Sequence, residues 1–178
     1  MWNFVGRQND LQNVTGNSQN GNWISGISGF DEWRLNASQE LPSSLKYNKG
    51  HNTYYFLPLI LGILGMIVMY KKRSMDFYTV LVMFIFTGLL VVVYLNQPPM
   101  EPRERDYTFA GSFQTFCIWI GLSVIFMVDL LRKAIGKPSA AIAATAIALI
   151  AAPALMGSQN WDDHDRSDRY LGISFAKN

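Results

Sequence analysis

Residues 94–109, YLNQPPMEPRERDYTF, separate two long apolar segments and decide how the chain folds. Before this stretch, residues 77–95 carry no charge, and after it a second apolar run extends over residues 107–131. The stretch itself contains three prolines, two arginines and three acidic residues. Unsatisfied polar groups cost several kcal/mol each in hydrocarbon, so a peptide this polar stays out of lipid. It therefore predicts a polar hairpin that joins two membrane helices.

The apolar residues of the whole chain are clustered. Hydrophobic residues make up 49% of the 178 residues, yet the segments at 1–53 and 158–178 are polar. Four apolar runs fill the middle of the chain, at about 54–70, 77–95, 107–131 and 139–157. Runs of roughly 17–25 apolar residues can cross a bilayer as helices, and a lone strand cannot satisfy its backbone there. The expected fold is an all-α membrane protein with four transmembrane helices.

Two features of the fourth run predict how it packs. Its alanines recur every four residues and give one smooth helix face: Ala140, Ala144, Ala148 and Ala152. Small side chains let a neighbouring helix approach closely, so this span is expected to pack inside the bundle. Pro153 is expected to kink it near its outer end.

The third run carries polar side chains that need partners. Within the bundle, we expect partners for three of them, Ser112, Gln114 and Thr115. Near the end of the same run, Asp129 is expected to pair with the adjacent bases, Arg132 and Lys133.

Basic residues predict the orientation of the helices. The loops at 71–76 and 132–138 hold three Lys or Arg residues each and a single acid between them. The loop at 96–106 has two Arg against three acids. Short loops enriched in Lys and Arg stay in the cytoplasm. We therefore expect both termini and the hairpin to face outward.

Composition and motifs argue against several classes of function. The formal net charge is only +2, without a basic stripe, so nucleic acid is not an expected partner. The single cysteine, Cys117, excludes an internal disulfide and is expected to be a small buried apolar residue. His51 and His164 are the only histidines in the sequence, and no conventional phosphate-loop, zinc-protease or serine-elbow motif is present.

The segment at 1–53 is rich in Asn, Gly and Ser, which mark turns, and it carries several Trp and Tyr residues. We expect a loop-rich outward layer. Its aromatic rings favour the membrane–water interface, although aromatic rings among polar residues are also typical of sugar-binding surfaces, and both interpretations stay open. The first residues lack the pattern of a signal peptide, which is unexpected for an outward segment.

The polar tail at 158–178 brings four carboxylates and an imidazole within seven residues: Asp162, Asp163, His164, Asp165 and Asp168. Oxygen ligands suit a hard divalent cation. The spacing matches no EF-hand loop, however, and Arg166 and Arg169 compete for the same carboxylates. We expect a solvated polar turn anchored by Trp161, and no metal or other cofactor within the chain.

Five motifs together resemble one family: WNFVGRQND, GNWISGI, LPLILGILG, NQPPMEPRERDY and NWDDHDRSDRY. It is a bacterial multi-pass membrane family, formerly a domain of unknown function, grouped with the protein O-mannosyltransferases. The resemblance covers roughly residues 1–170. It implies a GT-C type glycosyltransferase in the bacterial inner membrane, with an outward active site and both termini of this chain in the periplasm. Family members are longer, so the chain resembles an internal fragment whose tail leads to a soluble domain.

The resemblance also implies a reaction. A mannose-like sugar would pass from a polyprenyl-phosphate donor to Ser or Thr residues of exported proteins. In GT-C enzymes the catalytic acid lies on the first outward loop, which precedes this chain, so no catalytic residue is assigned and the Asp31–Glu32 pair is not given that role. The fragment alone is expected to be inactive. The alternative function is a non-catalytic membrane scaffold or a transport module.

The hairpin provides the candidate site residues. Arg103 and Arg105 are candidates for binding the donor phosphate, because a guanidinium offers a planar fork of donors at headgroup depth. Supporting residues would hold these side chains in position: Glu101, Glu104, Asp106, Arg7 and Asp10. The alternative interpretation is a structural cluster of ion pairs that ties the hairpin to the N-terminal layer.

Overall fold

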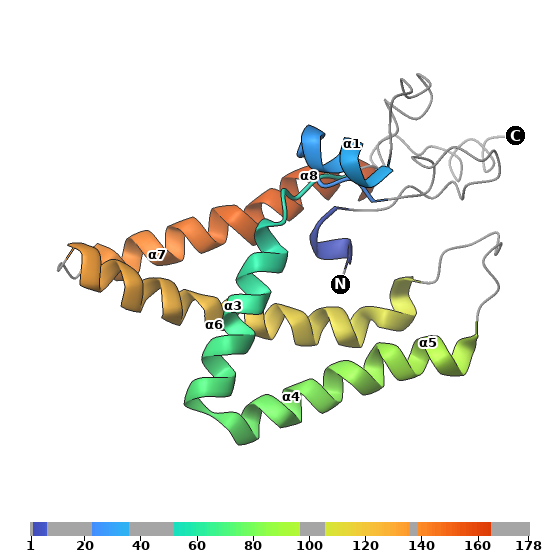
Figure 1. Cartoon of the computed structure of the whole chain (residues 1–178), viewed down its shortest axis with the longest axis horizontal. Helices are drawn as coiled ribbons and strands as arrows, with labels where there is room; N and C mark the ends of the chain where they lie inside the picture. The colour runs from blue at the N-terminus through green and yellow to red at the C-terminus, as the bar shows by residue number, and fades with distance from the viewer. Residues whose placement is uncertain (1, 7–22, 36–51, 97–105, 136–138, 165–178) are drawn as a thin grey trace, which may run out of the picture.

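The computed structural model describes residues 2–6, 23–35, 52–96, 106–135 and 139–164. Within these ranges all regular elements are helices, and an isolated antiparallel bridge pairs Gly6 with Thr53. The elements, shown in Figure 1, are η1 (Trp2–Phe4), α1 (Ser28–Leu35), α3 (Leu57–Lys72), α4 (Ser74–Thr87), α5 (Leu89–Leu95), η2 (Asp106–Phe109), α6 (Ala110–Ile135), α7 (Ser139–Leu149), the π-helical η3 (Ile150–Ala154) and α8 (Leu155–His164).

Three helical segments are long and apolar enough to cross a membrane: Ser74–Leu95, Tyr107–Lys133 and Ser139–Trp161. The first predicted span, at about 54–70, corresponds to α3, which has 16 residues. At 1.5 Å per residue it is about 24 Å long, shorter than the roughly 30 Å of hydrocarbon in a bilayer. The helices expected from the sequence are thus confirmed, but only three of the four reach spanning length.

Helix α3 is short because residues 54–56, which precede it, form contacts with the N-terminal segments instead of continuing the helix. The backbone N–H of Tyr54 donates to the carbonyl of Val5 (3.0 Å), and that of Tyr55 donates to Ser25 (2.9 Å). Tyr55 and Phe56 both have positive φ, which turns the chain sharply into the helix. Pro58 in the first turn then sets the start of α3, where its missing N–H costs nothing.

Two glycines allow α3 to cross α6 in close contact (Figure 1). A Cβ atom on Gly65 would lie 1.6 Å from the carbonyl oxygen of Trp119, and one on Gly62 would lie 2.2 Å from the ring of Phe116. Both aromatic side chains are fully buried, and their rings meet edge to face with centroids 6.0 Å apart. This crossing is the most extensive helix contact in the described structure and forms its core.

The other long helices pack against α6. A Cβ atom on Gly111 would lie 2.9 Å from the Thr87 side chain, and one on Gly88 would lie 3.1 Å from Ser112. The helical run Ser74–Leu95 is interrupted at Gly88, whose backbone (φ −117°, ψ −83°) separates α4 from α5.

The predicted small-residue face of the last span is confirmed. Its four alanines are buried, and α7 packs against α6: Ala140, Ala144, Ala148 and Ala152. Pro153 lies inside the π-helical segment η3. A proline removes one backbone donor, and a π-helical turn accommodates the loss without ending the helix. The distortion expected at Pro153 is therefore present as a π segment.

Two predictions about α6 were wrong, those for Gln114 and Cys117, whereas Ser112 and Thr115 are buried and have partners in the adjacent turn. Ser112 and Thr115 are buried, but their hydroxyls donate to carbonyls of their own chain one turn earlier, Phe109 (2.9 Å) and Gly111 (2.7 Å). This local bonding satisfies a hydroxyl without a partner on another helix. Gln114 is exposed. Cys117 is exposed instead of buried, whereas the neighbouring Phe116 and Trp119 are fully buried.

The charged residues also pair differently from the prediction. Asp129 accepts from the ammonium of Lys72 at 3.0 Å, instead of pairing with the bases on its own helix. Arg73 pairs with Asp76 at 3.4 Å. The first of these ion pairs joins the end of α3 to the last turns of α6, so the two helices share one charged end.

The polar tail starts later than expected. Residues 158–164 were predicted to form a polar turn, but they continue the last span as α8. The side chains of Ser158 and Asn160 donate to the carbonyls of Leu155 and Met156 in the same helix. This bonding keeps the polar side chains compatible with helix beyond the apolar run.

Replacing Gly65 with alanine is expected to destabilise the full chain. The added methyl group would collide with the backbone of α6, and overpacking typically costs about 1–3 kcal/mol. We expect a lower midpoint of thermal unfolding in detergent, followed by circular dichroism.

The matched control is Gly121→Ala in α6, where an added Cβ meets nothing within 4 Å. That change should leave the midpoint equal or slightly higher, since glycine in a helix costs roughly 0.5–1 kcal/mol relative to alanine. An unchanged midpoint for Gly65→Ala would contradict the crossing described above.

Candidate functional site

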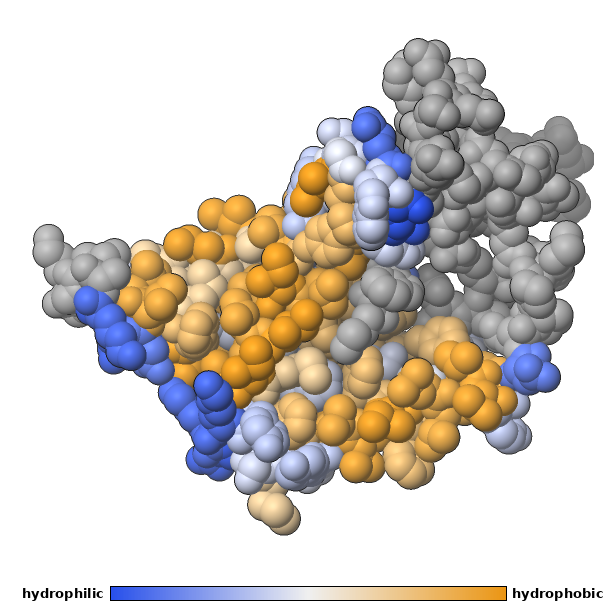
Figure 2. All heavy atoms as spheres, in the orientation of Figure 1, coloured by the Kyte–Doolittle hydropathy of each residue, from blue (hydrophilic) through white to orange (hydrophobic). Residues whose placement is uncertain are grey.

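The described structure has two polar ends. At one end, the N-terminal segments gather over the start of α3 and the end of α8; we call residues 2–6, 23–35, 52–56 and 155–164 the polar layer (Figure 1). At the other end, α3 meets α4 and α6 terminates; we call the exposed bases there the cationic end: Lys71, Lys72, Arg73, Arg132 and Lys133. Figure 2 shows hydrophobic side chains between these two ends.

Three chain segments are joined at the centre of the polar layer. The bridge between Gly6 and Thr53 places the first segment beside the residues that enter α3. A Cβ atom on Gly6 would lie 1.9 Å from the carbonyl oxygen of Ile24 and 3.0 Å from that of Asn52. Only glycine fits between these two backbones, so Gly6 lets segments distant in sequence come together.

Asp31 organises the start of α1. Its carboxylate accepts from the backbone N–H groups of Ser25 (2.9 Å) and Gly26 (3.0 Å), and the side chain is 8% exposed. Gly26 has φ +92°, a conformation that glycine adopts at little cost. Both carboxylate oxygens are thus engaged in holding a turn, which argues for a structural role. The neighbouring Glu32 is exposed.

Arg34 is held against an aromatic ring. Its guanidinium lies 3.8 Å from the centroid of the Trp23 ring and donates to the carbonyl oxygen of the same residue. Burial lowers the pKa of Arg34 from its usual value, and the negative charge of Asp31 partly opposes that shift. The contact joins the end of α1 to the segment before it.

Aromatic side chains surround this contact. Phe30 and Phe56 meet edge to face at 5.0 Å, and Trp23 meets Phe56 in the same way at 6.2 Å. Trp33 extends from α1 with 78% of its surface exposed. The arrangement offers an exposed ring beside a half-buried aromatic cluster, which suits either a membrane interface or the apolar face of a sugar.

An amide network ties α8 to the start of α3. The side-chain amide of Asn52 donates to the Asn160 carbonyl oxygen (2.9 Å), and Asn160 donates to the hydroxyl of Tyr54 (2.6 Å). Tyr54 is only 2% exposed. Sequence reasoning missed this network, because it placed Asn160 in a solvated tail. The presence of Asn160 in the motif NWDDHDRSDRY was the available signal.

Segment η1 lies near the start of α6. The ring of Phe4 is 4.4 Å from that of Phe116 and 6.0 Å from that of Phe113. These ring contacts place η1 of the polar layer against the first turns of α6. In the chain, the polar hairpin lies directly before η2 and α6.

Most of the predicted site residues lie outside the described residues: Glu101, Arg103, Glu104, Arg105, Arg7, Asp10 and Asp165. Asp106 begins η2, and Asp162, Asp163 and His164 form the end of α8. Among the residues that the structure describes, no group of three His, Cys, Asp or Glu side chains could hold a metal ion.

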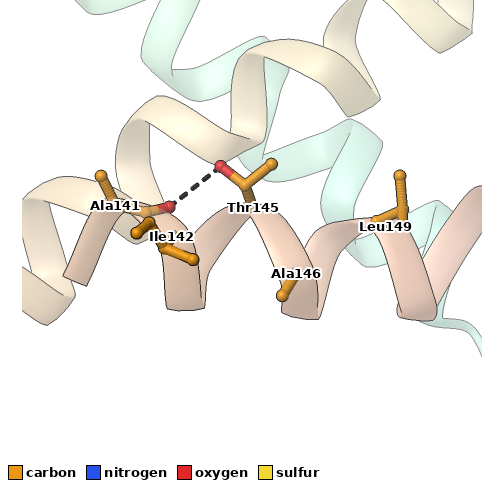
Figure 3. Close-up of a pocket in the computed structure, with 5 residues that line it drawn as sticks. All are labelled: Ala141, Ile142, Thr145, Ala146 and Leu149. Atoms are coloured by element: carbon orange, nitrogen blue, oxygen red, sulfur yellow. Dashed lines mark hydrogen bonds between the residues drawn. The ribbon is translucent and has the colours of Figure 1, made fainter. Parts of the chain in front are cut away.

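An apolar hollow of about 440 Å³ lies along the outer surface of α7 (Figure 3), lined by Ala141, Ile142, Thr145, Ala146 and Leu149. The hydroxyl of Thr145 donates to the carbonyl of Ala141 at 2.9 Å. The hydroxyl of Thr145 is thus already engaged within α7. The hollow is an apolar surface that lacks the convergent polar groups of a ligand site.

No family model, curated protein or solved structure matches the chain. The resemblance to the protein O-mannosyltransferases therefore stays a prediction that rests on the quoted motifs.

Replacing Asp31 with asparagine is expected to loosen the polar layer. Asparagine keeps the shape but loses the charge and one acceptor, and hydrogen bonds to charged groups contribute roughly 1.5–3 kcal/mol. Amide hydrogen exchange should become faster in peptides that cover residues 23–35.

The exposed neighbour provides the control, since Glu32→Gln removes the same charge without a described backbone contact. Equal exchange rates in the two variants would contradict the structural role of Asp31.

Proposed function

We propose that this chain is part of a membrane glycosyltransferase of the GT-C type. The enzyme transfers a mannose-like sugar from a polyprenyl-phosphate donor to Ser or Thr residues of exported proteins. The observation that carries the proposal is the meeting of distant motifs in the polar layer. Phe4 and Gly6 belong to WNFVGRQND, Trp23 and Ser25 belong to GNWISGI, and Asn160 belongs to NWDDHDRSDRY.

The polar layer is a suitable place for this chemistry. It covers one end of helices long enough to cross a membrane, so it lies at the depth of lipid headgroups. A polyprenyl-phosphate donor keeps its chain in the hydrocarbon and its phosphate at that depth.

The proposal includes α3 as a fourth span. A 16-residue helix can cross the bilayer when Lys71 and Lys72 extend their ammonium groups to the headgroups and the bilayer thins locally. Four spans return both ends of the chain to one side. The basic loops then lie in the cytoplasm and the polar layer faces the periplasm, where exported acceptor proteins are found.

The chemistry divides between this chain and the rest of the enzyme. Attack by an acceptor hydroxyl requires a base, and the departing phosphate requires positive charge. In the polar layer Asp31 is engaged with backbone N–H groups. The resemblance to GT-C enzymes implies that the base lies on the first outward loop of the longer protein. Arg103 and Arg105 of the hairpin supply the positive charge, with Glu101, Glu104 and Asp106 as supporting residues.

The exposed aromatic surface fits the same proposal. Trp33 and the cluster of Trp23, Phe30 and Phe56 provide rings that can cover the apolar face of a sugar.

The direct test uses the longer protein and an exported acceptor. Changing Arg103 and Arg105 to alanine should reduce sugar transfer about 100-fold, the effect of removing one donor that stabilises transition-state charge. The matched control is Arg166→Ala/Arg169→Ala, which removes the same charge from the tail and should leave transfer near its original rate. Unchanged transfer by the hairpin variant at normal protein level would refute the phosphate-binding role and favour a scaffold.

A further inference from the structure

The cationic end collects basic side chains from three places. Lys71 and Lys72 are the last residues of α3, Arg73 joins α3 to α4, and Arg132 and Lys133 lie in the last turns of α6. All five are exposed. Figure 2 shows hydrophilic side chains along this edge, where the ends of α3, α4 and α6 come together.

Acidic groups neutralise only part of this charge. Asp129 pairs with Lys72 and Asp76 pairs with Arg73. These are the acids at this end among the residues that the structure describes. Within that part of the chain, Lys71, Arg132 and Lys133 form no salt bridge, so an excess of three positive charges remains exposed.

An aromatic cluster lies next to these charges. The ring of Tyr70 meets those of Phe77 (5.3 Å) and Tyr78 (6.4 Å) edge to face. About half of each tyrosine side chain is exposed. Tyrosine favours the boundary between hydrocarbon and headgroups, so this cluster marks the depth at which the neighbouring bases meet the membrane.

We propose that the cationic end binds the headgroups of anionic phospholipids. Arg132, Lys133 and Lys71 contact the lipid phosphates, and Tyr70 and Tyr78 lie at the boundary with the acyl chains. The Lys72–Asp129 ion pair holds α3 against α6, and this places bases from both helices on one edge. The inference does not depend on sugar transfer, because it concerns the end opposite the polar layer.

The physical basis is electrostatic. A guanidinium and an ammonium both bind phosphate, and each base near an anionic surface strengthens binding about fivefold. The alternative is that these bases only stabilise the C-terminal ends of α3 and α6. Bases in the last turn of a helix interact favourably with its dipole whether or not a lipid is present. The two roles differ in whether the protein distinguishes anionic from neutral lipid.

Native mass spectrometry of the full chain in a neutral detergent tests the proposal. Phosphatidylglycerol and phosphatidylcholine of different mass are added at equal concentration, and the ratio of the two bound forms is measured. We expect several-fold more bound phosphatidylglycerol. The variant Arg132→Gln/Lys133→Gln should lower that ratio toward one.

Two controls separate charge from other effects. Arg132→Lys/Lys133→Arg keeps both charges and should keep the preference. The preference of the unchanged protein should fall as salt rises. Equal binding of the two lipids, a preference insensitive to salt, or an unaltered preference in Arg132→Gln/Lys133→Gln would each overturn the proposal.

Discussion

The close contact between α3 and α6 is the interaction on which the rest of the structure depends. Gly65 brings the backbone of α3 against the carbonyl of Trp119, and Gly62 leaves room for the Phe116 ring. In a membrane, helices gain little from the hydrophobic effect and rely on such close packing. With this crossing in place, α4 and α7 pack on the remaining sides of α6, where further small residues face them.

The same crossing separates two chemically different ends. The end of α3 is tied to α6 by the Lys72–Asp129 ion pair, and its start is tied to the polar layer by Tyr54 and Asn52. Apolar side chains occupy the surface between these ends, as Figure 2 shows. We propose an anionic lipid surface as the partner of one end and a polyprenyl-phosphate donor as the partner of the other.

Much of the fold could be predicted from hydrophobic runs, because a backbone in lipid has few alternatives to a helix. The alanine spacing in residues 140–152 predicted the face that packs on α6. The sequence could not show that residues 54–56 leave the first apolar run to join the polar layer, since that choice depends on contacts with Val5 and Ser25. Nor could it show that Asp129 reaches Lys72, 57 residues away. Of the candidate site, the predicted arginines lie outside the described residues, and the network around Asn160 depends on tertiary contacts.

We propose that the polar layer and the cationic end lie on opposite faces of the membrane, with the polar layer outward. Single cysteines at exposed positions, Ser28→Cys in the polar layer and Met75→Cys at the cationic end, can be introduced after Cys117→Ser removes the native thiol. A maleimide that cannot cross membranes is then added to intact cells. We expect labelling of Ser28→Cys alone, with Met75→Cys labelled only after the membrane is permeabilised. Labelling of both positions in intact cells, or of Met75→Cys alone, would contradict it.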